Sequence, residues 1–148
     1  MEFKLTAIIN RPLEEVFAFF RDVDQYAGCK GTIVPVYDKI TPGPLGVGTR
    51  YREVMQVLPF ITGEIQMEVV GFEPSRRLAY RYVALGMEGE LTYRFDAVVE
   101  GTRPVQRQSL WPGGLMRLFS PMIGVMFSRM VKRRLVWIKG FLESRSRV

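Results

Sequence analysis

The chain has 148 residues, 47% hydrophobic and 24% charged, which is typical of one globular domain and excludes an intrinsically disordered chain. The absence of histidine and the single cysteine, Cys29, exclude Ser-His-Asp and Cys-His catalytic centres, zinc sites built from Cys and His, and intrachain disulfides. The net charge of +6 fits either a solvated surface or an anionic partner. We expect one domain over residues 1–148 in a reducing, cytoplasmic compartment, with no metal ion and no cofactor.

The first segment, "EFKLTAIIN" (2–10), alternates between apolar and polar residues and predicts a half-buried strand. It contains Glu2 and no long apolar run, so we expect no secretory signal. A helix is predicted to begin at Pro12, because apolar residues then recur at helical spacing. These residues are Val16, Phe19, Phe20 and Val23.

Residues 32–111 alternate with a period of two in six segments that are separated by turn residues. The predicted strands are 32–40, 49–58, 63–72, 76–85, 88–100 and 102–111. Short connections between consecutive strands are typical of an antiparallel meander. Proline cannot donate to a strand ladder, so Pro35 predicts an edge position for the first of these strands. Pro104 likewise predicts an edge position or a bulge for the last.

Three glycines in "PGPLGVGTRYREVM" (42–55) suggest either a phosphate-binding loop or a tight turn. A phosphate-binding loop of the Walker type needs Lys and Ser or Thr after its last glycine, but Gly48 is followed by Thr49 and Arg50. A dinucleotide-binding loop leads into a helix, whereas a predicted strand follows here. We therefore interpret these glycines as a turn that enters a strand.

Helical spacing returns after Ser120 and predicts one long amphipathic helix over about 121–143. Seven of eight positions along one of its faces are apolar: Ile123, Met126, Phe127, Met130, Arg134, Trp137, Ile138 and Phe141. A curved antiparallel sheet needs a cover on one face, and this helix is the longest element predicted. The sequence thus predicts an α+β fold with a pocket between sheet and helix.

Five segments resemble the polyketide cyclase/dehydrase group of the START-related (SRPBCC, helix-grip) superfamily. They are "INRPLEEVFAFFRDVDQY", "GPLGVGTRYRE", "VVGFEPSRRLAYR", "TYRFDAVVEGTR" and a last helix ending "IKGFLES". The resemblance implies a seven-stranded curved antiparallel sheet wrapped around the C-terminal helix, with short helices between the first two strands and a hydrophobic cavity inside. It also implies that lipids, polyketides, sterols or similar apolar molecules bind there, without implying one reaction.

Strand alternation identifies the side chains expected to face such a pocket. The predicted ligand-binding residues are Phe20, Tyr51, Glu53, Met55, Met67, Tyr80, Tyr82, Tyr93, Phe95, Met122, Met126 and Met130. Plain core packing would explain the tyrosines and methionines equally well. Glu53 is the candidate catalytic residue, because a carboxylate on an apolar face is costly unless it is paired. A rim position, a Tyr or Arg partner, or a bulge would explain it structurally, and Glu88 with Glu90 is interpreted as a solvated outer face.

Three functions remain open. We expect the protein to bind or carry a small hydrophobic ligand (a lipid, polyketide, quinone or aromatic molecule) rather than to catalyse a reaction. One alternative is a cyclase/dehydrase-like enzyme that uses Glu53 and the pocket tyrosines for acid-base chemistry. Another is a membrane-surface or partner-binding module that uses the basic C-terminal helix and the apolar segment 111–119. No nucleic-acid-binding motif accompanies the positive charge, so we expect no nucleic-acid partner.

Overall fold

The structure is a computed structural model that describes residues 2–21, 36–58, 61–84 and 86–144. The strands and helices follow one another as β1 (Glu2–Thr6), α1 (Leu13–Arg21), β2 (Val36–Lys39), β3 (Arg50–Leu58), β4 (Ile61–Glu73), β5 (Arg77–Ala84), β6 (Met87–Val98), β7 (Gly101–Trp111), the 3-10 helix η2 (Gly114–Phe119) and α2 (Ser120–Ser144). The predicted α+β class, with an antiparallel sheet and a long C-terminal helix, is confirmed.

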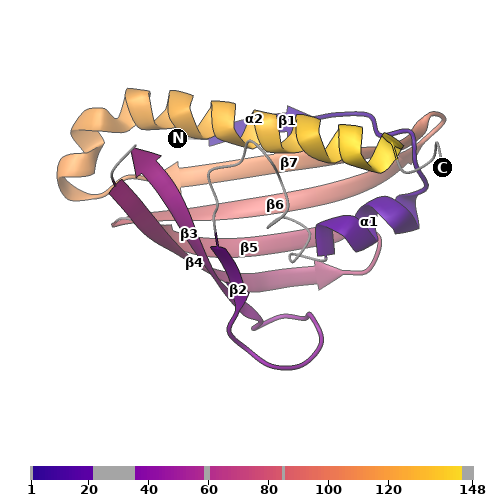
Figure 1. The fold of residues 1–148 in the computed structure, drawn as a ribbon, viewed down its shortest axis with the longest axis horizontal. Coiled ribbons are helices and arrows are strands. Elements are labelled where there is room, and N and C mark those ends of the chain that lie inside the picture. Colours follow the sequence, from indigo (N-terminus) through magenta and orange to yellow (C-terminus); the bar gives the residue numbers. More distant parts are fainter. Residues whose placement is uncertain (1, 22–35, 59–60, 85, 145–148) are drawn as a thin grey trace.

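The strands form one seven-stranded sheet in the order β1-β7-β6-β5-β4-β3-β2. All neighbouring strands are antiparallel, and β2 to β7 form a meander in chain order (Figure 1). Strand β2 lies at an edge, as predicted, although Pro35 itself is outside the described residues. The N-terminal strand β1 pairs with β7, so the first and the last strand of the sequence are neighbours at one edge of the sheet.

The position predicted from Pro104 is wrong, because β7 lies inside the sheet between β1 and β6. Pro104 is opposite Phe95 of β6, and its carbonyl accepts a hydrogen bond from the Ala7 N–H at 3.4 Å. In an antiparallel strand the N and the carbonyl of one residue point to the same neighbour, so the Pro104 nitrogen also faces the β1 side. The missing N–H therefore falls where the regular ladder with β1 ends after Thr6, and pairing resumes between Ile9 and Thr102.

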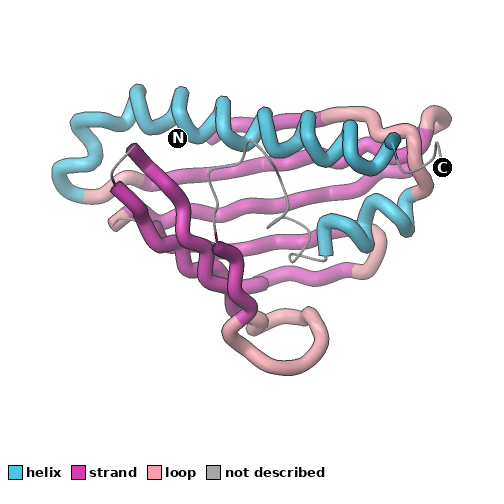
Figure 2. The backbone as a smooth tube through the Cα atoms, in the orientation of Figure 1, coloured by secondary structure: helices cyan, strands magenta, loops and turns pink. Residues whose placement is uncertain are grey.

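Helix α2 lies across one face of the sheet (Figures 1 and 2). Its boundaries agree with the predicted helix. Its buried side chains recur every three, four or eight residues: Ile123, Val131, Leu135, Ile138 and Leu142. Four of them pack in one core with the inner face of the sheet: Ile123, Leu135, Ile138 and Leu142.

Helix α1 packs between the sheet and the C-terminal half of α2. Phe20 contacts the rings of Tyr93 and Phe95, with centroids 4.9 Å and 5.2 Å apart. Phe19 contacts Phe141 of α2 with centroids 5.4 Å apart. Aromatic rings therefore fill the space between sheet and helix at this end of the molecule.

The glycine-rich loop before β3 is a turn, as predicted. Gly43 and Gly48 have φ angles of 92° and 95°, which side chains with a Cβ rarely adopt. The Gly46 N–H donates to the Thr49 hydroxyl at 3.1 Å, and the Gly48 N–H donates to the Val69 carbonyl at 2.9 Å. The loop thereby fixes the start of β3, the strand that carries Tyr51 and Glu53.

Candidate functional site

Most of the predicted ligand-binding side chains meet on the inner face of the sheet. Across the strands, Tyr51 of β3 is opposite Met67 of β4, which is opposite Tyr82 of β5. Seven predicted residues are buried in one cluster: Phe20, Tyr51, Met67, Tyr80, Tyr82, Tyr93 and Phe95. Glu88 and Glu90 are exposed, as expected for the outer face. The strand alternation therefore identified the inner face correctly, whereas the ligand-binding role of these residues stays a prediction.

Glu53 is buried in this face and only 3% exposed. Its Oε1 lies 4.0 Å from a guanidinium nitrogen of Arg134, which projects from the middle of α2. Of the structural explanations considered for Glu53, the arginine partner is the one observed. The sequence identified Arg134 as the one charged residue on the apolar face of the predicted helix, but it did not show that Glu53 is its partner.

Two tyrosines of neighbouring strands share the environment of this pair. Burial raises the pKa of Tyr93 to about 12, and Glu53 adds to this effect, whereas charge and hydrogen bonding from Arg134 oppose it. Burial also raises the pKa of Tyr80, with smaller contributions from Tyr93, Tyr51 and Glu53. Both hydroxyl groups therefore keep their protons at neutral pH. Glu53, Arg134, Tyr80 and Tyr93 form what we call the buried polar cluster.

A second group of buried polar side chains connects β5 to β7. The Gln108 side-chain amide donates to the Tyr82 hydroxyl at 2.8 Å, and the Gln106 amide donates to Gln108 Oε1 at 3.4 Å. The Tyr82 hydroxyl donates to the Ser109 carbonyl at 3.3 Å. Both glutamines lie on the inner face, next to Tyr93 and Leu91 of β6. They could have been found from the alternation of residues 102–111, had Pro104 not made the phase of that strand ambiguous.

The methionines predicted to follow one face of α2 are not all on that face. Met126 is partly buried and packs against the core, but Met122 is 65% exposed. Four residues rotate about 40° beyond one full turn of an α-helix, so residues at i, i+4 and i+8 do not stay on the buried face. Ile123 occupies the buried position instead. The side chains of Met55 and Met130 lie outside what the structure describes.

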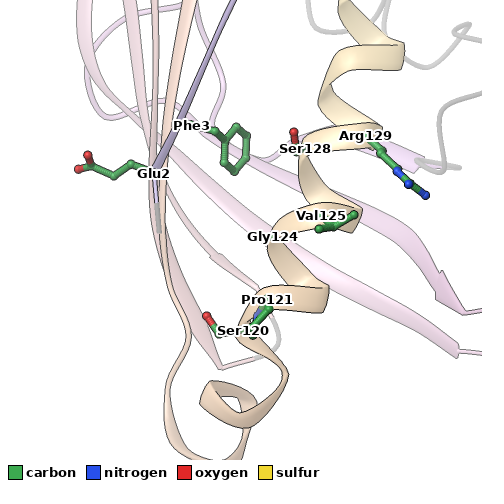
Figure 3. A pocket seen from close by; sticks show the side chains of 8 residues that line it. All are labelled: Glu2, Phe3, Ser120, Pro121, Gly124, Val125, Ser128 and Arg129. Carbon is green, nitrogen blue, oxygen red and sulfur yellow. The ribbon is translucent and has the colours of Figure 1, made fainter.

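A groove of about 530 Å³ lies between β1 and the first turns of α2 (Figure 3). Phe3 points from β1 toward the helix, whereas the Glu2 side chain points away from it. The groove is lined by Glu2, Phe3, Ser120, Pro121, Gly124, Val125, Ser128 and Arg129. Among the predicted ligand-binding residues whose side chains the structure describes, none lines this groove.

A comparison with family models gives a match over residues 1–143 to the family described as "Polyketide cyclase / dehydrase and lipid transport". The chain belongs to this polyketide cyclase/dehydrase and lipid transport family. The resemblance inferred from the five sequence segments is thus confirmed. A comparison with curated protein sequences gives no match.

Several solved structures have the same fold as this chain, and three of them are described here. TTHA0849 from Thermus thermophilus is 18% identical, with a TM-score of 0.82 and 99% of each chain covered. The Zhui aromatase/cyclase from Streptomyces sp. R1128 is 16% identical, with a TM-score of 0.83, and the match covers 99% of this chain and 95% of that one. One half of StfQ, the di-domain aromatase/cyclase of the steffimycin pathway, matches at 12% identity and a TM-score of 0.83, with 99% of this chain and 52% of that chain covered.

The TM-scores show that this member of the polyketide cyclase/dehydrase and lipid transport family shares its fold with the two aromatase/cyclases. They do not transfer a reaction, because one fold supports many activities. No helix in the described part of the chain combines the length and apolar character that crossing a membrane would require.

Proposed function

We propose that the protein binds a small, mostly apolar molecule that carries a hydroxyl or carbonyl group, in a cavity enclosed by the curved sheet and α2. In this proposal the apolar part of the ligand lies against the aromatic inner face, and the buried polar cluster binds its polar group. The observation that carries the proposal is that Glu53 and Arg134 form an ion pair inside a largely aromatic and aliphatic interior.

The energetics of a buried ion pair favour a role in binding over a role in stability. Removing two charges from water costs several kcal/mol per ion, at the order-of-magnitude level, and apolar replacements of such pairs often leave stability unchanged or improved. The two closest charged atoms are 4.0 Å apart, beyond hydrogen-bond distance. Within the described residues the buried Glu53 Oε1 accepts no hydrogen bond, so in this proposal a ligand hydroxyl donates to that oxygen.

The surrounding residues favour an aromatic or polycyclic ligand over a charged one. Phe20, Tyr51, Met67 and Phe95 supply large apolar surfaces, and the Tyr80 and Tyr93 hydroxyl groups stay protonated and can donate hydrogen bonds. The family description names polyketides and lipids, and two structures of the same fold are described as aromatase/cyclases. The proposed ligand is therefore a lipid, a polyketide, a quinone or an aromatic molecule that carries a hydroxyl or carbonyl group.

Binding can be tested with two probes that differ by a single hydroxyl group, 2-naphthol and naphthalene. A hydrogen bond to a charged group contributes about 1.5–3 kcal/mol, so we expect wild-type protein to bind 2-naphthol roughly tenfold or more tightly than naphthalene in calorimetric titrations. This preference should disappear in Glu53→Gln and in Arg134→Met. The matched control is Glu64→Gln, which removes a carboxylate of the exposed Arg52–Glu64 pair. Equal affinities for the two probes, or the same preference in all variants, would contradict the proposal.

A second candidate function is acid-base catalysis on the bound molecule, supported by the position of the Glu53 carboxylate among protonated tyrosines. A carboxylate base could remove a proton next to a ligand carbonyl while a tyrosine donates a hydrogen bond to the oxygen. The probe is 2-tetralone in D₂O, followed by NMR for exchange of its α-protons. Faster exchange with wild type than with Glu53→Gln would support this function. Exchange at the uncatalysed rate would leave binding as the only proposed activity.

A further inference from the structure

The connection between β7 and the first turns of α2 exposes an unusual number of large apolar side chains. Leu115 is 79% exposed and Leu118 is 77% exposed. Large exposed apolar residues occur singly on most proteins, but contiguous apolar patches mark interaction sites. The group consists of Trp111, Leu115, Leu118, Phe119, Met122 and Val125.

The same part of the chain is strongly basic. From Gly101 to Leu142 the sequence contains no acidic residue and eight basic ones: Arg103, Arg107, Arg117, Arg129, Lys132, Arg133, Arg134 and Lys139. Arg103 pairs with Asp96, Arg134 with Glu53 and Lys139 with Glu143. The structure records no ion pair, over the residues it describes, for Arg117, Arg129, Lys132 or Arg133.

The exposed apolar and basic side chains in the first half of α2 share one side of the helix. Met122 and Val125 are exposed on the first turns, and Arg129, Lys132 and Arg133 follow at helical spacing on the same exposed side. Leu115, Arg117 and Leu118 extend this surface into η2, which joins β7 to α2 at the left of Figure 1. We call it the apolar-basic surface.

We propose that the apolar-basic surface binds a lipid membrane surface that contains anionic headgroups. Exposed leucines next to Trp, Phe and several cations are what an interfacial membrane contact requires, because apolar side chains enter the acyl boundary while cations meet lipid phosphates. The six apolar residues are exposed and not part of the core, so they can enter a lipid interface without unfolding.

The groove beside α2 opens within this surface, since Val125 and Arg129 belong to both. Two acidic residues adjoin it: Glu88 is opposite Trp111 in the ladder, and Glu2 lines the groove with its side chain turned away from α2 (Figure 3). The cations outnumber them, so the surface favours a negatively charged partner. A nucleic acid would satisfy the cations, but it would leave the exposed leucines without a partner.

Flotation with vesicles tests the proposal directly. Full-length protein should bind vesicles of phosphatidylglycerol and phosphatidylcholine, bind pure phosphatidylcholine much less, and lose binding as salt rises. The double variant Leu115→Ser/Leu118→Ser should lower partitioning by roughly tenfold or more. Its matched control is Val47→Ser, which changes a 71% exposed residue of the loop before β3.

The charge contribution has its own pair of variants. Lys132→Gln/Arg133→Gln should reduce binding to anionic vesicles by roughly 30-fold, because two cations next to the anionic surface are lost. Arg50→Gln/Arg81→Gln, which changes exposed arginines of β3 and β5, should reduce it much less.

Several results would overturn the proposal. These are no vesicle binding at low salt, equal binding to both vesicle types, or equal losses in test and control variants. Light scattering after size exclusion provides a further test, because a stable dimer that Leu115→Ser/Leu118→Ser dissociates would assign the surface to a second copy of the chain. The 2-naphthol titration uses no lipid, so its outcome is independent of this one.

Discussion

Glu53 illustrates what can be predicted for a single residue. The alternation of β3 placed its carboxylate on the apolar face, and Arg134 stood out as the charged position on the apolar face of α2. Neither pattern gives the rotation of a helix relative to a sheet, so the pairing could not be predicted. For the same reason the sequence left a rim position, a bulge and a Tyr or Arg partner open as structural explanations for Glu53.

The Glu53–Arg134 pair makes a prediction about stability. Arg134→Met leaves a buried carboxylate without its guanidinium, so we expect the free energy of unfolding in urea to fall by about 3–5 kcal/mol. The double variant Glu53→Leu/Arg134→Met should recover most of this loss, because the uncompensated charge is gone. Arg52→Met, which breaks an exposed pair, should cost about 0–1 kcal/mol. A double variant as unstable as Arg134→Met would show that the pair is not the cause.

Tyr93 makes a prediction about alkaline pH. Burial raises its pKa in the folded chain to about 12, from a usual value near 10, so between these values the folded state retains a proton that the unfolded state has lost. The contribution of Tyr93 to stability is therefore full below about pH 10 and is lost as the pH rises toward about 12. Tyr93→Phe should reduce the alkaline loss of stability by about 2–3 kcal/mol. Urea unfolding curves at both ends of this range provide the measurement, and an unchanged slope with pH would contradict the assignment.

At the scale of elements, one side chain connects three strands. Gly89 of β6 lies opposite Tyr82 of β5, and a Cβ built on Gly89 would be 2.2 Å from the Tyr82 ring. The ring therefore crosses β6 over this glycine, which lets the Tyr82 hydroxyl reach Gln108 and the Ser109 carbonyl of β7. The absence of a side chain at Gly89 lets the Tyr82 ring pack directly on the β6 backbone, which is a common role of glycine inside strands.

Gly89→Ala should displace this ring and destabilise the protein by about 1–3 kcal/mol. In a Tyr82→Ala background the same substitution should cost little, because the ring it displaces is absent. Gly140→Ala is the control, since no atom lies within 4 Å of a Cβ built there. That substitution in α2 should stabilise the protein by up to about 1 kcal/mol. Similar costs for Gly89→Ala in both backgrounds would contradict the proposed packing.

The elements themselves could largely be predicted, because each strand or helix is determined by a local period. The end of α2 agreed with its 3.6-residue pattern to within a residue. The wrong predictions concern two residues, Pro104 and Met122, whose surroundings depend on more than the local sequence pattern. Pro104 suggested an edge strand or a bulge, but its nitrogen lies just beyond the end of β1. Met122 has the i, i+4 spacing to Met126, but this spacing exceeds a full helical turn, so Met122 lies on the exposed side of α2.

On the scale of the whole molecule, α1 and the buried ion pair meet α2 at different places. Phe19 of α1 packs against Phe141 near the C-terminal end of α2, whereas Glu53 meets Arg134 near its middle. The fold class and the cover by α2 could be predicted, because an antiparallel sheet with one apolar face needs such a cover. The polar cluster could not, because it depends on how distant elements are placed, whereas the basic helix and the apolar segment 111–119 were already apparent in the sequence as a candidate membrane-binding surface.

The central claim is that a ligand lies between the inner face of the sheet and α2, next to the buried polar cluster. Methyl NMR spectra of protein with ¹³C-labelled methionine methyl groups, recorded during titration with 2-naphthol, test it most directly. We predict that the signals of Met67 and Met126 shift with saturation, that the exposed Met122 signal does not, and that Glu53→Gln weakens the response. Unchanged Met67 and Met126 signals at saturating 2-naphthol, or a shift confined to Met122, would contradict the claim.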